Sequence, residues 1–170
     1  MFFIFIRKYK FFILFLVLLL TIVLIFVVRE IQTQKFNERV MLASEFSEII
    51  YQNAIIYGKV DFNEITDFEW DQLLLIRPYM RPREVFEREG LYWQNIRTNI
   101  QFHDSITLIV FLYNNQIVAF RDHSRGFGDF IVSENADLLR GYIIYYRNYA
   151  VFEAQFEISN RLLLIHTSNE

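Results

Sequence analysis

Two His–Asp pairs are the residues of this sequence best suited to carry chemistry. His103 precedes Asp104, and Asp122 precedes His123. If the strands on either side of an Asn-Asn turn pair as a hairpin, both pairs lie at its open end, with His103 roughly opposite Gly126. Two imidazoles and two carboxylates placed together could bind a metal ion. Ordinary polar strand ends are the competing interpretation, which we favour, and we predict no metal site.

Catalytic signatures are otherwise missing from the chain. It has no Gly-x-Ser-x-Gly, no His-Glu-x-x-His, no phosphate-binding loop and no cysteine. We therefore predict no catalytic residues and no cofactor. A small membrane-tethered enzyme is the remaining enzymatic alternative, and it would use Asp71, His103, Asp122 or His123. Four arginines between residues 77 and 88 could bind an anion, but the glutamates among them favour local ion pairs.

These residues follow a long apolar segment, Phe11–Val28, in which 17 of 18 residues are apolar and Thr21 is the exception. As a helix it would cover roughly 27 Å, close to the hydrocarbon thickness of a bilayer. A cleaved signal peptide usually has a shorter apolar run followed by small residues, and neither feature is present here. We predict a transmembrane anchor at 11–28, a basic N-terminus at 1–10 and a juxtamembrane segment at 29–35.

The orientation of this anchor rests on a small charge difference. Three basic residues precede the run, and Arg29, Lys35 and Arg39 follow it. The free amino group adds one positive charge to the short side, and basic flanks stay in the cytoplasm. We expect a cytoplasmic N-terminus, with residues 36–170 on the periplasmic or extracellular side of a bacterial cytoplasmic membrane.

Residues 36–170 have the size of one domain. They contain 12 basic and 19 acidic residues, a formal charge of −7. Nucleic-acid binders need a basic surface that displaces counterions, so we predict no nucleic-acid partner. The lipid bilayer, through residues 11–28, and another protein are the expected partners. The absence of cysteine is compatible with either side of a membrane.

Hydrophobic periodicity places the main elements of this domain. Apolar residues recur at helical spacing from Phe36 to Tyr57, which predicts a long amphipathic helix ending at Gly58. Pro82 and Gly90 bracket a short helix. Strands are predicted at 73–76, 106–113, 116–121, 152–158 and 162–165, with turns at 114–115 and 159–160. The expected fold is α+β: an N-terminal transmembrane helix, then the amphipathic helix packed on an antiparallel sheet.

One stretch carries a resemblance to a known group. Its pattern is an aromatic-x-Trp-Asp start at Trp70 and Asp71, an apolar strand, Pro78-Tyr79, and an Arg-x-x-Gly-Asp-Phe sequence that contains Arg125 and Asp129. This pattern resembles that of small exported or membrane-anchored bacterial proteins of unassigned function. The similarity covers about residues 66–132 and implies an envelope location, without implying an activity.

The motif residues of this stretch are our candidate site. We interpret them as determinants of the fold first and as a recognition surface second: Trp70, Asp71, Pro78, Tyr79, Arg125 and Asp129. Trp70 and Tyr79 should anchor the two ends of one strand, Asp71 should bond a neighbouring backbone group or Arg125, and Arg125 with Asp129 should hold the loop 123–130.

The expected function is that of a single-pass envelope protein with a non-enzymatic protein-interaction domain. An immunity-type protein that neutralises an envelope-acting toxin is an alternative, because an acidic domain suits a basic partner. Assembly into a homo-oligomer through the amphipathic helix also stays open.

Overall fold

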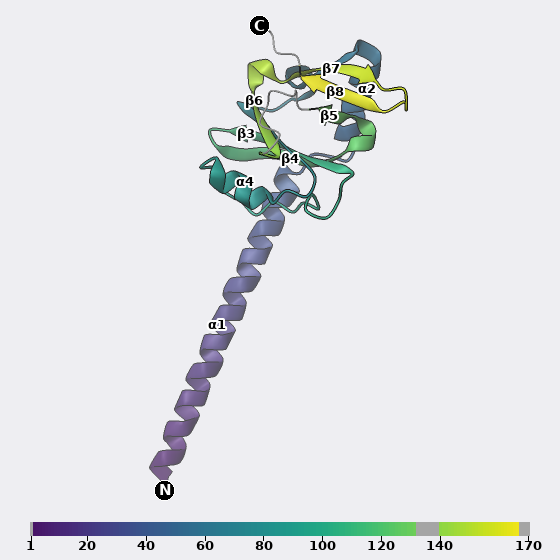
Figure 1. Ribbon diagram of the computed structural model, residues 1–170. Helices are drawn as coiled ribbons and strands as arrows, with labels where there is room; N and C mark the ends of the chain where they lie inside the picture. The colour runs from purple at the N-terminus through teal and green to yellow at the C-terminus, as the bar shows by residue number, and fades with distance from the viewer. Residues whose placement is uncertain (1, 132–139, 167–170) are drawn as a thin grey trace. The chain divides into compact units, whose positions relative to one another are not determined.

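The computed structural model describes residues 2–131 and 140–166, with side chains from Tyr9 onward. Contacts divide the chain into two units, Met1–Arg39 and Val40–Glu170. The first unit lies within α1 (Phe2–Val40), and the second, hereafter the folded unit, contains the remaining elements (Figure 1). Its helices and strands confirm the predicted α+β class.

The first helix contains the apolar run. From Tyr9 to Val40 it is long and apolar enough to cross a membrane, and its side chains from Phe11 to Val28 are exposed along the whole run. Thr21 donates its hydroxyl proton to the carbonyl of Leu18 at 2.7 Å. The one hydroxyl in the run is therefore satisfied inside the helix, as a hydrocarbon environment requires.

The predicted single helix from Phe36 to Tyr57 is wrong, because the chain leaves the helical conformation after Val40. It resumes as α2 (Phe46–Tyr57), which ends at Gly58 with a left-handed backbone, as predicted. In the interruption, the Leu42 N–H donates to the Phe120 carbonyl at 2.9 Å. A backbone pairing with a distant strand thus overrides the local helical periodicity.

Four antiparallel strands form sheet A, in the order β4-β3-β2-β6. They are β2 (Gln72–Ile76), β3 (Ile106–Tyr113), β4 (Gln116–Ser124) and β6 (Tyr142–Tyr146). The predicted hairpin of β3 and β4 is present, and Asn114 and Asn115 both have positive φ in its turn. β3 is interior and nearly all buried, as its apolar residues on both faces predicted.

A bulge between Phe111 and Leu112 shifts the register of this hairpin by one residue. The Arg125 N–H consequently donates to the Ser105 carbonyl at 2.9 Å, and β3 begins only at Ile106. The expected position of His103 opposite Gly126 is therefore wrong, and His103 lies in the turn region before the strand.

Sheet B has the order β1-β7-β8-β5. It contains β1 (Lys59–Asp61), β5 (Asp129–Ile131), β7 (Val151–Phe156) and β8 (Leu162–His166). β7 and β8 form the predicted hairpin, but β5 pairs with β8 in parallel. Two sheets thus replace the single antiparallel sheet expected. In Figure 1, β5, β7 and β8 lie in one layer and β3, β4 and β6 in another.

Short helical segments connect and cover these sheets. The ring of Phe62, in α3 (Phe62–Ile65), makes edge contacts with Phe111 of sheet A and Phe152 of sheet B. α4 (Pro82–Arg88) begins with Pro82 as predicted. Arg81 at its N-cap and Arg83 in its first turn form local ion pairs with Glu84 and Glu87. The 3-10 turns η1 (Arg125–Phe127) and η2 (Arg147–Tyr149) lead from β4 into β5 and from β6 into β7.

The main hydrophobic core gathers side chains from α2 and from both sheets. α2 contributes Phe46, Ile50 and Ala54. Facing residues of the sheets include Leu73, Leu75, Ile109, Phe111, Val60, Phe152 and Leu164. Burial of this apolar surface is the main force that holds the two sheets together.

Candidate functional site

Four of the six predicted site residues line one cavity. Pro78, Tyr79, Arg125 and Asp129 all border a hollow of about 570 Å³. We call it the intersheet cavity, because its apolar wall comes from both sheets: Leu75, Ile143 and Tyr145 of sheet A, and Phe130 and Ile131 of sheet B. Its size lies in the range of pockets that hold small molecules or side chains.

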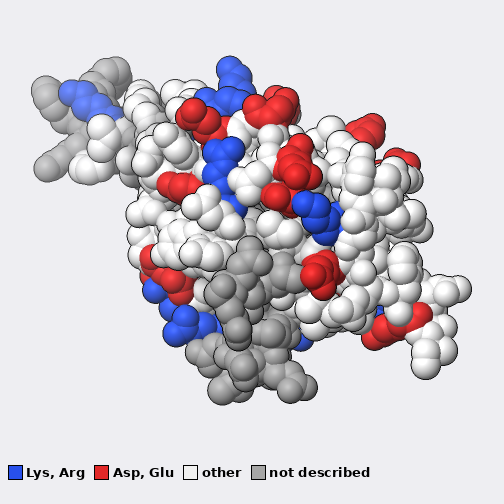
Figure 2. Space-filling view, turned by 90° about the horizontal axis from the view of Figure 1, so that it is seen from above, with Lys and Arg blue, Asp and Glu red and all other residues white. Residues whose placement is uncertain are grey.

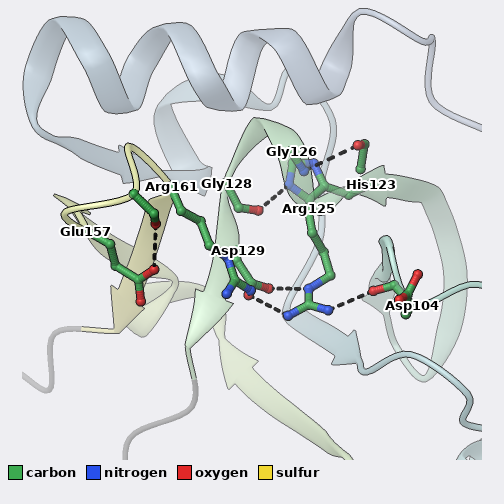
Figure 3. A network of polar contacts seen from close by, with 10 residues as sticks. Asp104, His123, Arg125, Gly126, Gly128, Asp129, Glu157 and Arg161 are labelled. Atoms are coloured by element: carbon green, nitrogen blue, oxygen red, sulfur yellow. Dashed lines mark hydrogen bonds and ion pairs between the residues drawn. The ribbon is translucent and has the colours of Figure 1, made fainter.

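Two of the lining residues, Arg125 and Asp129, belong to an ion cluster, which Figure 3 shows. Asp129 is 3% exposed and accepts two hydrogen bonds from Arg125, from Nε and from Nη2, both at 2.6 Å. Arg161, which directly precedes β8, also donates to this carboxylate. The remaining Nη1 of Arg125 donates to the Asp104 carbonyl at 2.7 Å. Arg125 and Asp129 thereby hold the loop 123–130, as expected.

The geometry of this cluster explains its electrostatics. A buried carboxylate is costly unless charged hydrogen bonds compensate for the lost water, and here two guanidinium groups do so. The hydrogen bonds that Arg125 donates to the Asp129 carboxylate raise the pKa of Arg125 above its usual value. Because its donors are already engaged within the fold, Arg125 primarily fixes the loop rather than binding a ligand anion.

His123 lies beside the same loop but points into the core. Its Nε2 is 2.8 Å from the Gly128 carbonyl, which can only accept, so Nε2 carries the proton. Its Nδ1 is 3.1 Å from the Ser47 hydroxyl and accepts from it. Burial lowers the pKa of His123 to about 4, because the charged imidazolium would lose its hydration. At neutral pH this histidine is an uncharged structural residue.

Trp70 and Asp71 lie at the opposite end of β2 from Pro78 and Tyr79. Trp70 is 1% exposed, and its indole N–H donates to Thr66 Oγ1 at 2.8 Å. Asp71 accepts from the Asn114 N–H at 2.9 Å, which is the neighbouring backbone group we anticipated. Neither residue lines the intersheet cavity, so both act as fold determinants in this structure.

Tyr79 differs from the anchor that the sequence suggested. Its side chain is 62% exposed, and its backbone has φ of 65°. A bulky residue in the left-handed region is strained. The Tyr79 N–H donates to the Ile100 carbonyl at 2.9 Å, which helps to hold this conformation. The ring is therefore presented to solvent rather than used for packing.

Two cavity residues were missed by sequence reasoning. Thr107 is 4% exposed and Tyr145 is 9% exposed, and both line the intersheet cavity. Neither hydroxyl has a hydrogen-bond partner within the described part of the chain. Burial raises the pKa of Tyr145 to about 12. No local motif marks these positions, although both fall on the core face of a strand with apolar alternation.

The four residues considered for catalysis do not gather. Asp122 and His123 are successive on β4, so their side chains point to opposite faces. Asp122 accepts from the Thr98 hydroxyl and from the Asn99 N–H, whereas His123 is buried in the core. Within residues 9–131 and 140–166, no group of three or more His, Cys, Asp and Glu side chains could hold a metal ion.

Comparisons of the chain with protein-family models, with curated proteins and with solved structures find no match. The intersheet cavity and its surroundings are thus judged by their own geometry.

Proposed function

We propose that this protein is a single-pass membrane protein of the bacterial envelope, and that its folded unit binds another protein outside the cytoplasmic membrane. The membrane anchor is supported by the exposed apolar surface of α1. Side chains from Phe11 to Val28 present an apolar surface on all sides of the helix, and a helix that is apolar all round requires a buried or lipid environment.

A binding role for the folded unit is supported by its surface. Figure 2 shows a face on which acidic and basic side chains are interspersed among uncharged ones, a distribution that suits a protein partner better than a polyanion. Beside the intersheet cavity, Tyr79 presents an exposed ring on a strained backbone. Exposed aromatic side chains are typical anchors of protein interfaces.

The topology can be tested with single cysteines, because the chain has none of its own. Ser159 lies in the exposed turn between β7 and β8, so Ser159→Cys reports on the folded unit. Phe2→Cys reports on the N-terminus. In cells with an intact inner membrane and a permeabilised outer barrier, a membrane-impermeant maleimide should label position 159 and not position 2. Labelling of position 2 with protection of position 159 would reject the proposed orientation.

Binding can be tested by crosslinking in intact membranes. A photoreactive amino acid in place of Tyr79 should give a discrete crosslinked band that is absent when the same group replaces Ile22, in the apolar run. If neither position nor other exposed positions of the folded unit yield a specific protein adduct, the interaction role is wrong even if the anchor is correct.

A further inference from the structure

Strand β6 forms one edge of sheet A, and no described strand pairs with its outer side. The Arg77 N–H donates to the Gly141 carbonyl, and the Arg147 N–H donates to the Asp71 carbonyl, both at 2.9 Å. In an antiparallel ladder the residues that bond a given neighbour alternate. Residues 141, 143, 145 and 147 thus face β2, while Tyr142, Ile144 and Tyr146 direct their N–H and C=O groups outward.

These outward groups lack hydrogen-bond partners among residues 2–131 and 140–166. The edge strands of sheet B, β1 and β5, have three residues each, whereas β6 at the edge of sheet A has five. An open edge of this length is a template on which a further strand can pair.

Both faces of this edge are hollowed. On the core face, Ile143 and Tyr145 line the intersheet cavity. On the other face, a second hollow of about 510 Å³ is lined by Tyr142, Ile144 and Tyr146 of β6, by Ile143 between them, and by Gln72, Glu89, Leu91, Asn115 and Arg140. The successive side chains of an added strand point to opposite faces of a sheet. The two hollows are therefore placed to receive alternate side chains of one strand.

We propose that β6 is a docking edge for an extended segment of the partner protein, which adds to sheet A as a fifth strand. This inference rests on the proposed binding function and deepens it. Backbone hydrogen bonds to Tyr142, Ile144 and Tyr146 would supply affinity, and the hollows would supply specificity. The segment carries apolar side chains at alternate positions, which enter the intersheet cavity against Leu75 and Phe130.

The chemistry of the cavity sharpens the description of this segment. The unpartnered hydroxyls of Thr107 and Tyr145 favour a side chain or backbone group that can hydrogen-bond within the cavity. Arg77 also lines it, is exposed, and has no ion-pair partner in the described chain. Charge complementarity therefore places an acidic residue in the segment beside Arg77.

The alternation along β6 provides the test. Ile144→Pro removes an outward N–H that no described residue uses, and proline is tolerated at such an edge position. Ile143→Pro removes an N–H that faces β2 and should impair folding. The full chain in lipid nanodiscs is screened against a library of random twelve-residue peptides displayed on phage. Enriched peptides should share the alternating apolar pattern and bind Ile144→Pro about tenfold or more weakly than the wild type and Ile144→Val.

Amide hydrogen exchange keeps the proposal testable if Ile144→Pro does not fold. In the wild-type chain, addition of an enriched peptide should slow exchange at Ile144 and Tyr146, with little change at Ile143. The proposal is overturned if no peptide is enriched over empty nanodiscs, if enriched peptides bind Ile144→Pro as well as the wild type, or if peptide leaves exchange at Ile144 unchanged.

Two further outcomes separate this proposal from others. A concentration-dependent dimer that protects Ile144 without peptide would make a second copy of this chain the occupant and overturn the partner segment. If the Tyr79 crosslink to a partner persists in Ile144→Pro, the proposed binding function stands while the docking edge fails.

Discussion

The two edges of sheet A are built differently. At β4, the Leu42 N–H donates to the Phe120 carbonyl, and Gln94 Oε1 accepts from the Ile117 N–H at 3.0 Å. At β6, by contrast, the outward backbone groups of Tyr142, Ile144 and Tyr146 lack partners within the described residues. Edge strands invite unwanted pairing, and proteins usually cover or blunt them. Sheet A thus has one covered edge and one edge whose outward backbone groups lack described partners, and the docking edge proposed above rests on this difference.

The loop that follows β4, the covered edge, is held by ion pairs. Residues 125–129 lead from β4 into β5, and the carboxylate of Asp129 is held by Arg125 and Arg161. At β6 the charged contacts are of another kind, because the Tyr142 hydroxyl donates to Glu89 and the Arg88 guanidinium lies over the Tyr142 ring. The two edges therefore differ in how their outward backbone groups are paired, and the following predictions test this contrast.

The largest expected effect comes from the buried carboxylate. Asp129→Ala leaves two guanidinium groups without their counterion, so we expect the free energy of unfolding to fall by about 3 to 4 kcal/mol. Urea unfolding followed by the fluorescence of the two tryptophans, Trp70 and Trp93, measures this change. Glu87→Ala is the matched control, because it breaks an exposed ion pair with Arg83 and should cost at most about 0.5 kcal/mol. Equal losses of unfolding free energy in the two variants would show that the ion cluster does not stabilise the loop after β4.

The next effect is a pH dependence that arises at His123. Its pKa is about 4 in the folded chain and 6.5 when unfolded, so the unfolded state binds the proton first as the pH falls. Stability should therefore be lost between about pH 6.5 and pH 4, by about 3 kcal/mol in total. His123→Gln retains a donor and an acceptor but cannot titrate. The wild type should lose more stability than this variant over that range, and parallel pH profiles would rule out the assignment.

A smaller loss of stability is expected when the hydrogen bond between Gln94 and the outer side of β4 is removed. Gln94→Ala removes the acceptor of the Ile117 N–H and should cost about 1 kcal/mol. Gln94→Glu keeps an acceptor oxygen and should retain most of the stability. Thermal unfolding of the two variants provides the comparison. If both lose the same stability, the hydrogen bond to β4 contributes nothing, and the contrast between the edges is weaker than the structure suggests.

The smallest effect requires no mutation. Without a partner, the amides of Ile144 and Tyr146 should exchange hydrogen faster than those of Ile143 and Tyr145, whose N–H groups face β2. Alternating exchange rates along β6, resolved by NMR, would support the open edge. Uniform protection of all four amides would show that the outer side of β6 is already paired.

Much of the local structure followed from the sequence. The Asn114-Asn115 turn was predictable because asparagine tolerates positive φ, and the φ values of 50° and 60° confirm this. Pro82 as the first residue of α4 and Gly58 as the end of α2 follow from similarly local steric rules. The membrane-spanning length of α1 follows from composition.

The predictions from the sequence were wrong where contacts with distant residues outweighed local conformational preferences. The helical periodicity of residues 36–57 is real, yet Met41 and Leu42 leave the helix to cover β4. The bulge at Phe111 and the parallel pairing of β5 with β8 likewise depend on neighbours remote in sequence. Neither the bulge nor the parallel pairing can be predicted from the few residues on either side of it in the sequence.

The candidate site divides in the same way. The motif residues Pro78, Tyr79, Arg125 and Asp129 could be singled out from the sequence, but their shared cavity could not. Thr107, Tyr145 and the partner Arg161 carry no motif at all. They belong to the site because strands from two sheets bring them there.

The sequence by itself determined the apolar N-terminal helix, the α+β class, the hairpin turns and the acidic character of residues 36–170. These properties depend on composition, on side-chain periodicity and on the φ preferences of single residues, which act over a few positions. Only the tertiary structure decided which edge of sheet A is covered, where the intersheet cavity lies and which arginines hold Asp129. Those features depend on the register and order of strands far apart in the chain, and burial of the common core selects among the alternatives.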